Sequence, residues 1–150
     1  MTKMPKVLYH GSSKKLVGDT LNPSQGDDSD ERPENKLFGV YATDRKDFAI
    51  TMAIITCKGV TGGSIEGFTK DTIDAKIYGK FPKQKYVSLY TLPTKTFKPT
   101  KSIKHQFISD APVKPIKTEK ILVSDYLHLI KKATKEETKR WTEKYGKKKK

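Results

Sequence analysis

The sequence has few of the residues that build metal centres, disulfides or membrane spans. Cys57 is the single cysteine among 150 residues, which excludes an intramolecular disulfide and a cysteine-based zinc cluster. The longest apolar run is too short to cross a bilayer, and the N-terminus lacks the long apolar segment of a secretory signal. Walker loops, Gly-x-Gly-x-x-Gly boxes and His-Glu-x-x-His pairs are also missing. We therefore expect a protein without a metal or a membrane anchor, in the reducing cytoplasm.

Arginine is scarce although lysine is abundant. Lys and Arg number 31 against 17 Asp and Glu, a net charge of +14, yet only Arg32, Arg45 and Arg140 are arginines. Because guanidinium forks carry much of base-edge and phosphate recognition, dense nucleic-acid readout is disfavoured. Half of the charge excess lies in residues 131–150, where nine Lys and one Arg stand against three Glu, a net of +7. This basic C-terminus is either a nucleic-acid contact or a solubilising helix and tail.

Length and composition predict one compact domain of the α+β class. A hydrophobic fraction of 34% in 150 residues leaves little material for a second core. We expect the domain over residues 1–133 and a basic C-terminal helix and tail over residues 134–150. Many short strands without regular strand-helix alternation favour α+β over a doubly wound sheet. The expected extended segments are residues 7–9, 37–43, 86–92 and 121–123, with short pieces around Phe97, Ile103, Phe107, Ile108, Val113 and Ile116.

One early helix is predicted over residues 45–56. Asp44 is placed to cap it, because its carboxylate can accept the free N–H groups of the first turn. Phe48, Met52 and Ile55 recur at helical spacing and form its expected inner face. Further expectations are a mobile loop over residues 22–36, a turn of helix around residues 71–77, helices over residues 125–133 and 134–145, the latter with a Thr134–Glu137 capping box, and disorder over residues 147–150.

His10, Gly11 and Tyr41 form the most informative group of residues. A His at a strand end can donate to a sugar hydroxyl, while the backbone of the following Gly can exchange two hydrogen bonds with a planar amide. That pair fits a nicotinamide riboside. Tyr41 can then cover the cationic ring, an interaction worth about 1 to 2 kcal/mol. Plain structural roles stay open: His10 in a satisfied turn, Gly11 at positive φ and Tyr41 in strand packing.

These residues resemble the ADP-ribosyltransferase superfamily, especially its His-Tyr-acid branch, which includes the poly-ADP-ribose polymerases and the small rifamycin-modifying transferases. The likeness covers about residues 7–56 and continues more weakly to the C-terminal strands. Each piece is unspecific by itself, and their order carries the resemblance. The matching pieces are residues 8–12 (LYHGS), Gly18, residues 21–23 (LNP), residues 39–43 (GVYAT), the helix containing Ala49, and more weakly residues 86–92 and 106–116.

The resemblance implies a split, mixed or antiparallel sheet with short helices, and NAD as the co-substrate for ADP-ribose transfer to an unidentified macromolecule or small molecule. His10 and Gly11 would bind the nicotinamide ribose and the carboxamide, Ser12 would assist, and Tyr41 would be the second-motif residue. The third-motif position falls on Gln106, where the family usually has an acid. Asp110 and Glu119 are the alternatives for the missing charge.

Three functions follow from these observations. The first is an NAD-dependent ADP-ribosyltransferase with His10, Tyr41 and Gln106 as its catalytic residues. The second is a nucleotide-binding module of the same fold without catalysis, because neutral Gln106 can orient hydroxyls but cannot stabilise a developing cation by charge. The third is a basic nucleic-acid-binding protein whose affinity depends on residues 131–150 and falls steeply with salt.

Overall fold

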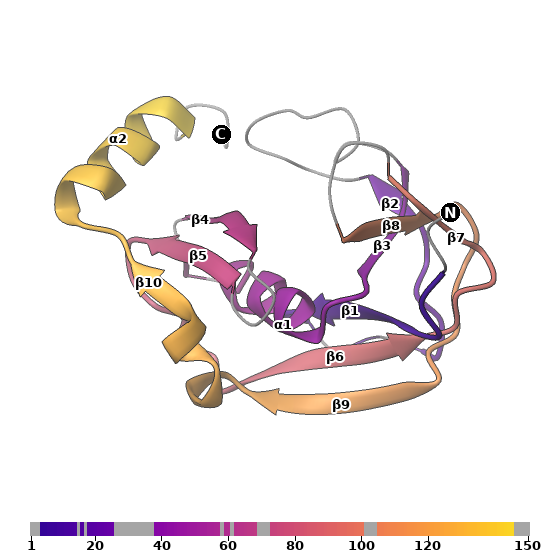
Figure 1. Cartoon of the computed structure of the whole chain (residues 1–150). Helices are drawn as coiled ribbons and strands as arrows, with labels where there is room; N and C mark the ends of the chain where they lie inside the picture. Colours follow the sequence, from indigo (N-terminus) through magenta and orange to yellow (C-terminus); the bar gives the residue numbers. More distant parts are fainter. Residues whose placement is uncertain are drawn as a thin grey trace.

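The computed structural model describes residues 4–14, 16, 18–25, 38–57, 59–60, 62–68, 73–100 and 105–145. They form two β-sheets and two α-helices, which confirms the expected α+β class (Figure 1). The larger sheet has the order β7 (Phe97–Pro99), β8 (Gln106–Ser109), β3 (Phe38–Thr43), β1 (Leu8–Ser12), β6 (Tyr86–Leu92) and β9 (Lys117–Leu122), with β2 (Ser24–Gln25) paired to β3. The smaller sheet has the order β10 (Ile130–Lys132), β5 (Ile73–Tyr78) and β4 (Gly62–Phe68). Among the pairings described, only β10 with β5 is parallel.

Helix α1 (Lys46–Ile55) lies between the two sheets (Figure 1). Its small residues Ala49 and Ala53 approach β1, and Ile55 packs against β4. Because the helix is covered on two sides, its buried surface is wider than a single stripe. Met52 lies outside that surface and is 38% exposed, so the prediction that it belongs to the inner face is wrong.

A second hydrophobic core covers the opposite face of the larger sheet. It draws on side chains from β1, β3, β6, β7 and β8, and on the Leu21–Val113 bridge, whose backbone groups exchange two hydrogen bonds of 2.8 Å. The larger sheet therefore has apolar side chains on both faces, which the alternation of its strands did not predict. The members of this core are Leu8, Leu21, Val40, Ala42, Tyr90, Leu92, Phe97, Phe107 and Val113.

Two helices expected from the sequence are wrong. The segment around residues 71–77 contributes strand β5, in which Ile73, Ala75 and Ile77 are buried at the two-residue period of a sheet. Residues 125–133 form 3-10 turns, η2 (Val123–Asp125) and η3 (Leu127–Leu129), followed by strand β10. Pairing with β5 overrides the weak helical pattern there, and the Ala133 N–H donates to Ile77 O at 2.8 Å. By contrast, the strands expected over residues 86–92 and 37–43 are confirmed, the latter from Phe38 on.

The C-terminal helix α2 (Lys135–Tyr145) is confirmed together with its capping box. Thr134 Oγ1 accepts the Glu137 N–H at 3.1 Å, and Glu137 Oε1 accepts the Thr134 N–H at 3.0 Å. Trp141 stacks on Tyr78 of β5 with ring centroids 5.3 Å apart, and a Cβ at Gly62 would lie 2.2 Å from its ring. Trp141 is therefore an anchor of α2 on the smaller sheet, and its side chain is buried rather than available to stack with bases.

Several expectations fall on residues that the structure does not describe. They concern Ile103, the tail over residues 147–150 and most of the loop over residues 22–36, all of which lie outside the described residues. Within the described part of the chain, neither helix has the length and apolar character needed to span a membrane.

Candidate functional site

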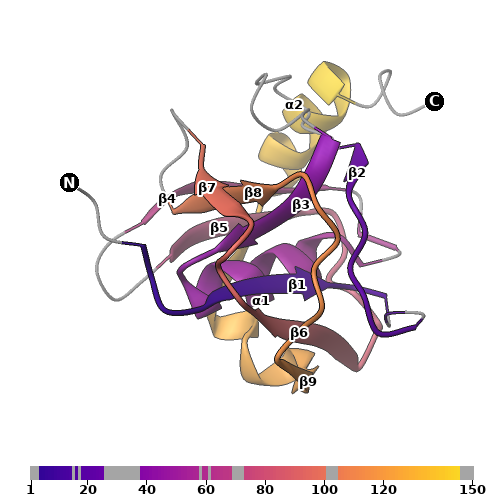
Figure 2. The same ribbon diagram turned by 90° about the vertical axis from the view of Figure 1, so that its right-hand side faces the viewer.

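Strand β1 is bonded differently along its two edges. Along one edge it pairs with β6 at five successive positions, from Leu8 opposite Leu92 to Ser12 opposite Ser88. Along the other edge it pairs with β3 at a single position, Tyr9 opposite Thr43. Beyond that pair β3 continues along β8 and diverges from β1 (Figure 2). The ladder between β1 and β3 is therefore limited to that pair, and we call the unpaired region beyond it the opening.

His10 lies inside β1 at the start of the opening, not at a strand end as the sequence predicted. Its Nδ1 is 2.6 Å from the carbonyl oxygen of Tyr41. A carbonyl can only accept, so Nδ1 carries the proton and the neutral ring presents a lone pair at Nε2. No group in the described part of the chain hydrogen-bonds Nε2. His10 therefore offers an acceptor, to which a ligand hydroxyl would donate, instead of the donor that the sequence predicted.

The environment of His10 keeps the ring neutral. Burial lowers the pKa of His10 below its usual value of 6.5, and the hydrogen bond to the Tyr41 carbonyl acts in the opposite direction but is the smaller effect. The ring of Tyr90 contributes to that burial, with its centroid 6.1 Å from the imidazole centroid. At neutral pH the site thus contains an uncharged imidazole in one defined tautomer.

Gly11 has a structural reason to be glycine. A Cβ at this position would lie 1.9 Å from the carbonyl oxygen of Ala49 and 3.1 Å from Cβ of Ala53, because α1 crosses directly over β1. Its φ is not positive, so the alternative of a left-handed turn is wrong. If the ladder of β1 and β3 continued, Gly11 would lie opposite Tyr41. The opening instead leaves the backbone of Gly11 beside the ring of His10.

Tyr41 lies on β3, directly across from Ile108 of β8, and is half-buried. Its neighbours Val40 and Ala42 belong to the second core, so strand alternation directs the phenol to the other face of the sheet. The structure thus brings the carbonyl of Tyr41, not its phenol, to His10. A ligand contacted by both side chains must enter edge-on between β1 and β3.

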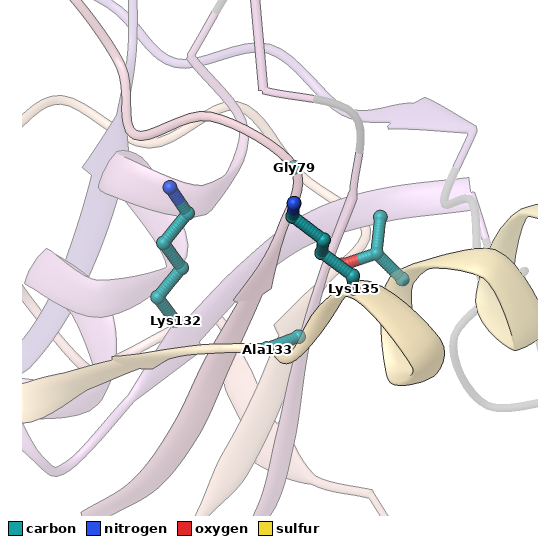
Figure 3. Close-up of a pocket in the computed structure, with 5 residues that line it drawn as sticks. Gly79, Lys132, Ala133 and Lys135 are labelled. Carbon is teal, nitrogen blue, oxygen red and sulfur yellow. The ribbon is translucent and has the colours of Figure 1, made fainter.

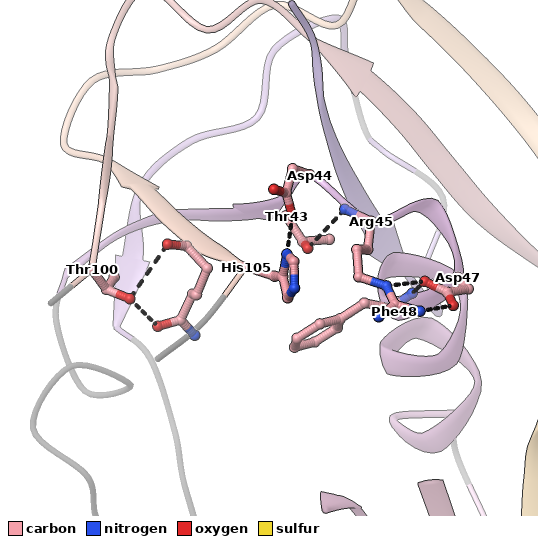
Figure 4. Close-up of polar contacts among 8 residues, drawn as sticks. Thr43, Asp44, Arg45, Asp47, Phe48, Thr100 and His105 are labelled. Atoms are coloured by element: carbon pink, nitrogen blue, oxygen red, sulfur yellow. Dashed lines mark hydrogen bonds and ion pairs between the residues drawn. The ribbon is translucent and has the colours of Figure 1, made fainter. Parts of the chain in front are cut away.

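Gln106 begins β8 and belongs to the one row in which β1, β3 and β8 are all paired. It lies opposite Thr43, which lies opposite Tyr9. Its Oε1 accepts a hydrogen bond from Thr100 Oγ1 at 3.1 Å (Figure 4). Neighbouring strands are about 4.8 Å apart, so the backbone of Gln106 is about two strand spacings from that of Tyr9, the residue before His10.

The two acidic alternatives to Gln106 lie elsewhere in the sheet. Asp110 is exposed and follows the last residue of β8, at the end where β3 and β8 have already left β1. Glu119 lies on the edge strand β9, two strands from β1 on the other side, and its carboxylate contacts Lys46 and Lys117 at 3.7 and 3.3 Å. Of the three residues, Gln106 is the one in the row that joins the strands of His10 and Tyr41.

Asp44 and His105 form a contact that the sequence did not predict. His105 Nδ1 is 2.8 Å from Asp44 Oδ1, between the end of β3 and the start of β8 (Figure 4). His105 has a φ of 64°, a left-handed conformation that is uncommon outside glycine. The 61 residues between the partners leave no local signal for this contact. Asp44 is consequently not the helix cap, and the prediction that it caps α1 is wrong.

The first turn of α1 is satisfied by other side chains. Thr43 Oγ1 accepts the Arg45 N–H at 3.1 Å, and Asp47 Oδ1 accepts the Phe48 N–H at 2.8 Å. The guanidinium of Arg45 also pairs with Asp47 at 2.6 Å. These contacts fix the short segment between β3 and α1. That segment follows Thr43, the residue that lies opposite Gln106.

Two pockets are described, and no residue of β1 or β3 lines either of them. One, of about 290 Å³, includes Tyr90 and Thr118 and lies on the second-core face of the larger sheet. The other, of about 260 Å³, lies between Gly79 and the start of α2, with Lys132 and Lys135 extending toward it (Figure 3). His10, Tyr41 and Gln106 line neither of these two pockets.

Cysteine and metal chemistry have no site among the described residues. Burial raises the pKa of Cys57, whose Sγ lies 3.5 Å from the Ala53 carbonyl at the end of α1. Its role as a small apolar filler at a helix end fits this position. In the described ranges, no cluster of three or more His, Cys, Asp or Glu side chains could hold a metal ion.

Comparisons of the chain with protein-family models, with characterised proteins and with solved structures found no match. The basis for a function is therefore the opening itself and the residues that it brings together.

Proposed function

We propose that this chain is an ADP-ribosyltransferase-like protein that binds NAD at the opening between β1 and β3 and transfers ADP-ribose to an acceptor. One observation carries the proposal: the sheet parts where the His-Gly and Tyr motifs of the resemblance lie on neighbouring strands. Antiparallel strands that stay paired offer a ligand no free edge. Here the backbone groups of β1 and β3 beyond the Tyr9–Thr43 pair are not paired with each other, and such groups suit a flat amide and a sugar.

Each residue has a distinct task in the proposed complex. Nε2 of His10 accepts a hydrogen bond from a hydroxyl of the nicotinamide ribose, because the Tyr41 carbonyl already holds Nδ1–H. The backbone of Gly11 exchanges hydrogen bonds with the carboxamide. The phenol of Tyr41 covers the pyridinium ring from the β3 side. Ser12 is the next residue on β1 and extends the contact along the ligand.

The reaction that this site would support breaks the bond between the nicotinamide nitrogen and the ribose carbon. The bonding electron pair leaves with neutral nicotinamide, and the sugar becomes cationic before the acceptor attacks it. A carboxylate would stabilise that cation electrostatically. Gln106 is neutral and is oriented by Thr100, so it can position ribose hydroxyls but supplies no charge. We expect turnover to be slow compared with an enzyme that has an acid at this position.

Release of nicotinamide from NAD by the purified chain tests the proposal. His10→Ala and Tyr41→Ala should each lower the rate by about 5- to 30-fold, since each loses a ligand contact worth about 1 to 2 kcal/mol. His128→Ala is the matched control, because His128 is exposed on a 3-10 turn and contacts neither strand of the opening. Equal turnover in the three folded variants would remove the assignment.

A second function, nucleotide binding without turnover, is favoured by Gln106 itself. Calorimetry would then show NAD binding while no nicotinamide is released. Gln106→Glu should in that case create or increase nicotinamide release by restoring a negative charge. If this variant changes neither binding nor turnover, Gln106 does not contact the ligand.

A further inference from the structure

The face of β1 that carries His10 continues as a polar surface beyond that residue. Register places Ser12 opposite Ser88 of β6, and Ser88 opposite Lys120 of β9. Side chains in register on neighbouring antiparallel strands share a face, and His10 and Ser12 are two residues apart. The three side chains therefore form a row parallel to that of His10, Tyr90 and Thr118. We call Ser12, Ser88 and Lys120 the serine-lysine row.

The two hydroxyls of this row keep their protons for donation to a ligand. Ser12 Oγ accepts the N–H of Lys14 at 3.1 Å, which leaves its own proton to donate. Ser88 has no side-chain hydrogen bond within the described residues and is half-buried. Two adjacent hydroxyl donors beside an ammonium are well suited to the oxygens of a phosphate group.

Three lysines on the segments that form the row have no acidic partner among the described residues. Lys14, Lys85 and Lys120 are exposed, and none of them forms an ion pair with a described residue. The ammonium groups of Lys120 and Lys85 lie 4.2 and 5.6 Å from the centroid of the Tyr86 ring. Both ammonium groups are thus near one ring at the start of β6, beside Ser88.

The chain around Lys14 is tied to the same place. Nε2 of Gln84 donates to the carbonyls of Ser13 and Tyr86, at 2.6 and 2.7 Å. This double contact fastens the segment after β1 to the start of β6. The positive charge of the row is therefore built from three separate segments that converge, not from one run of lysines.

On the opposite face of β9, the positive charge of a lysine is neutralised by an ion pair with a carboxylate. Lys117 is three residues from Lys120, so it faces the other way. Its ammonium group lies 3.3 Å from Glu119, which also contacts Lys46 at 3.7 Å. Two lysines share one carboxylate on that face, whereas no described carboxylate pairs with Lys120. The contrast identifies the serine-lysine row as the side that would accept an anion.

We propose that the serine-lysine row, with Lys14 and Lys85, binds the diphosphate of NAD. This inference rests on the proposed function and adds the direction in which the nucleotide runs, from nicotinamide ribose at His10 toward Ser12. Residues two apart on a strand are separated by about 6.8 Å. That length suits the step from a ribose ring through its 5′ carbon to a diphosphate. The site should therefore prefer ligands that carry the diphosphate over nicotinamide riboside.

Calorimetric titration of the full chain with NAD, ADP-ribose, inorganic pyrophosphate and nicotinamide riboside tests the inference. Lys120→Gln should weaken NAD and ADP-ribose binding by about fivefold, as expected for one exposed charge contact. It should leave nicotinamide riboside binding unchanged. Lys117→Gln is the matched control, since it removes the same charge from the same strand on the opposite face, and it should change each affinity by less than about twofold.

The outcomes separate this inference from the proposed function. If NAD binds and Lys120→Gln and Lys117→Gln weaken it equally, the diphosphate subsite is wrong while the NAD site stands. If neither NAD nor nicotinamide riboside binds but ADP-ribose and pyrophosphate bind in a Lys120-dependent way, the row is a phosphate site and the nicotinamide site is wrong. If pyrophosphate and ADP-ribose do not bind, or bind the Lys120→Gln protein unchanged, the subsite is overturned.

Discussion

The two sides of strand β1 differ sharply in how they are held. Toward β6 it is paired at five positions, and α1 crosses behind it so closely that Gly11 has no room for a side chain. Toward β3 it is paired at one position and then released. One strand is therefore supported along one edge while its other edge is unpaired with β3 beyond Tyr9, where we propose that the ligand binds. This arrangement meets the requirement that binding groups be pre-organised by a rigid scaffold.

On the side of β1 that is held by β6 and α1, we expect the largest loss of stability from a substitution at Gly11. Gly11→Ala would place a methyl group 1.9 Å from the Ala49 carbonyl oxygen, so α1 must move, and we expect a loss of about 3 kcal/mol or more in the free energy of unfolding. Urea denaturation measures it. Gly18→Ala is the comparison, because nothing lies within 4 Å of its Cβ and only its φ of 87° is unfavourable, a cost of about 1 kcal/mol. Equal losses in the two variants would show that α1 does not press on β1.

On the side of β1 that faces β3, the test residue is Thr100, which contacts Gln106 at the start of β8. Thr100→Val removes the hydroxyl that donates to Gln106 Oε1 and should lower the free energy of unfolding by about 1 kcal/mol. Because Gln106 then has more freedom, nicotinamide release should fall further than the small loss of stability explains. Unfolding and nicotinamide release are measured on the same preparation. A variant with unchanged release would mean that the orientation of Gln106 is unimportant.

The comparison can be sharpened with pH at His10. Burial lowers the pKa of His10 in the folded chain below its usual 6.5, so the unfolded chain binds the proton more readily. The contribution of His10 to stability is therefore complete above pH 6.5 and is lost as the pH falls from 6.5 toward the folded pKa. His10→Gln should flatten this part of the stability profile. An unchanged profile would indicate that another group titrates there.

The smallest effect is expected at α2, remote from β1. The ion pair with Lys76 and the capping hydrogen bonds hold the pKa of Glu137 at about 2 instead of 4.5. Its contribution is thus present above pH 4.5 and is lost as the pH falls toward 2. Trp141 is the single tryptophan, so its fluorescence reports the docking of α2. Glu137→Gln should weaken the acid dependence of that signal without changing NAD affinity, and a change in NAD affinity would contradict the separation of the two regions.

The sequence predicted the elements with strong local signals. The strand over residues 86–92 alternates along its whole length, and helix α2 begins with a complete capping box, so both could be predicted. The segments around residues 71–77 and 125–133 could not, because their conformation follows from pairing with each other across the small sheet. Met52 was misplaced because the surface that α1 buries between the two sheets is not the stripe of Phe48, Met52 and Ile55 that the spacing suggested. Met52 lies outside the buried surface.

The residues of the candidate site were proposed from the sequence, but their geometry could not be predicted from it. The His-Gly and Tyr motifs are local and can be found in the sequence. Of Gln106, Asp110 and Glu119, strand order in the structure places only Gln106 in the row that joins the strands of His10 and Tyr41. The direction of the His10 hydrogen bond depends on the opening of the sheet, which no local pattern encodes. The Asp44–His105 contact joins residues 61 positions apart, and the serine-lysine row exists only once three strands are in register.

Titration of the chain with NAD, followed at the NMR resonances of His10 and Tyr41, tests the central claim most directly. We predict saturable shifts of the His10 ring and the Tyr41 ring at the same NAD concentration, with the His10 ring remaining neutral. Shifts confined to surface lysines, or no shift of either ring at saturating NAD, would contradict binding at the opening between β1 and β3.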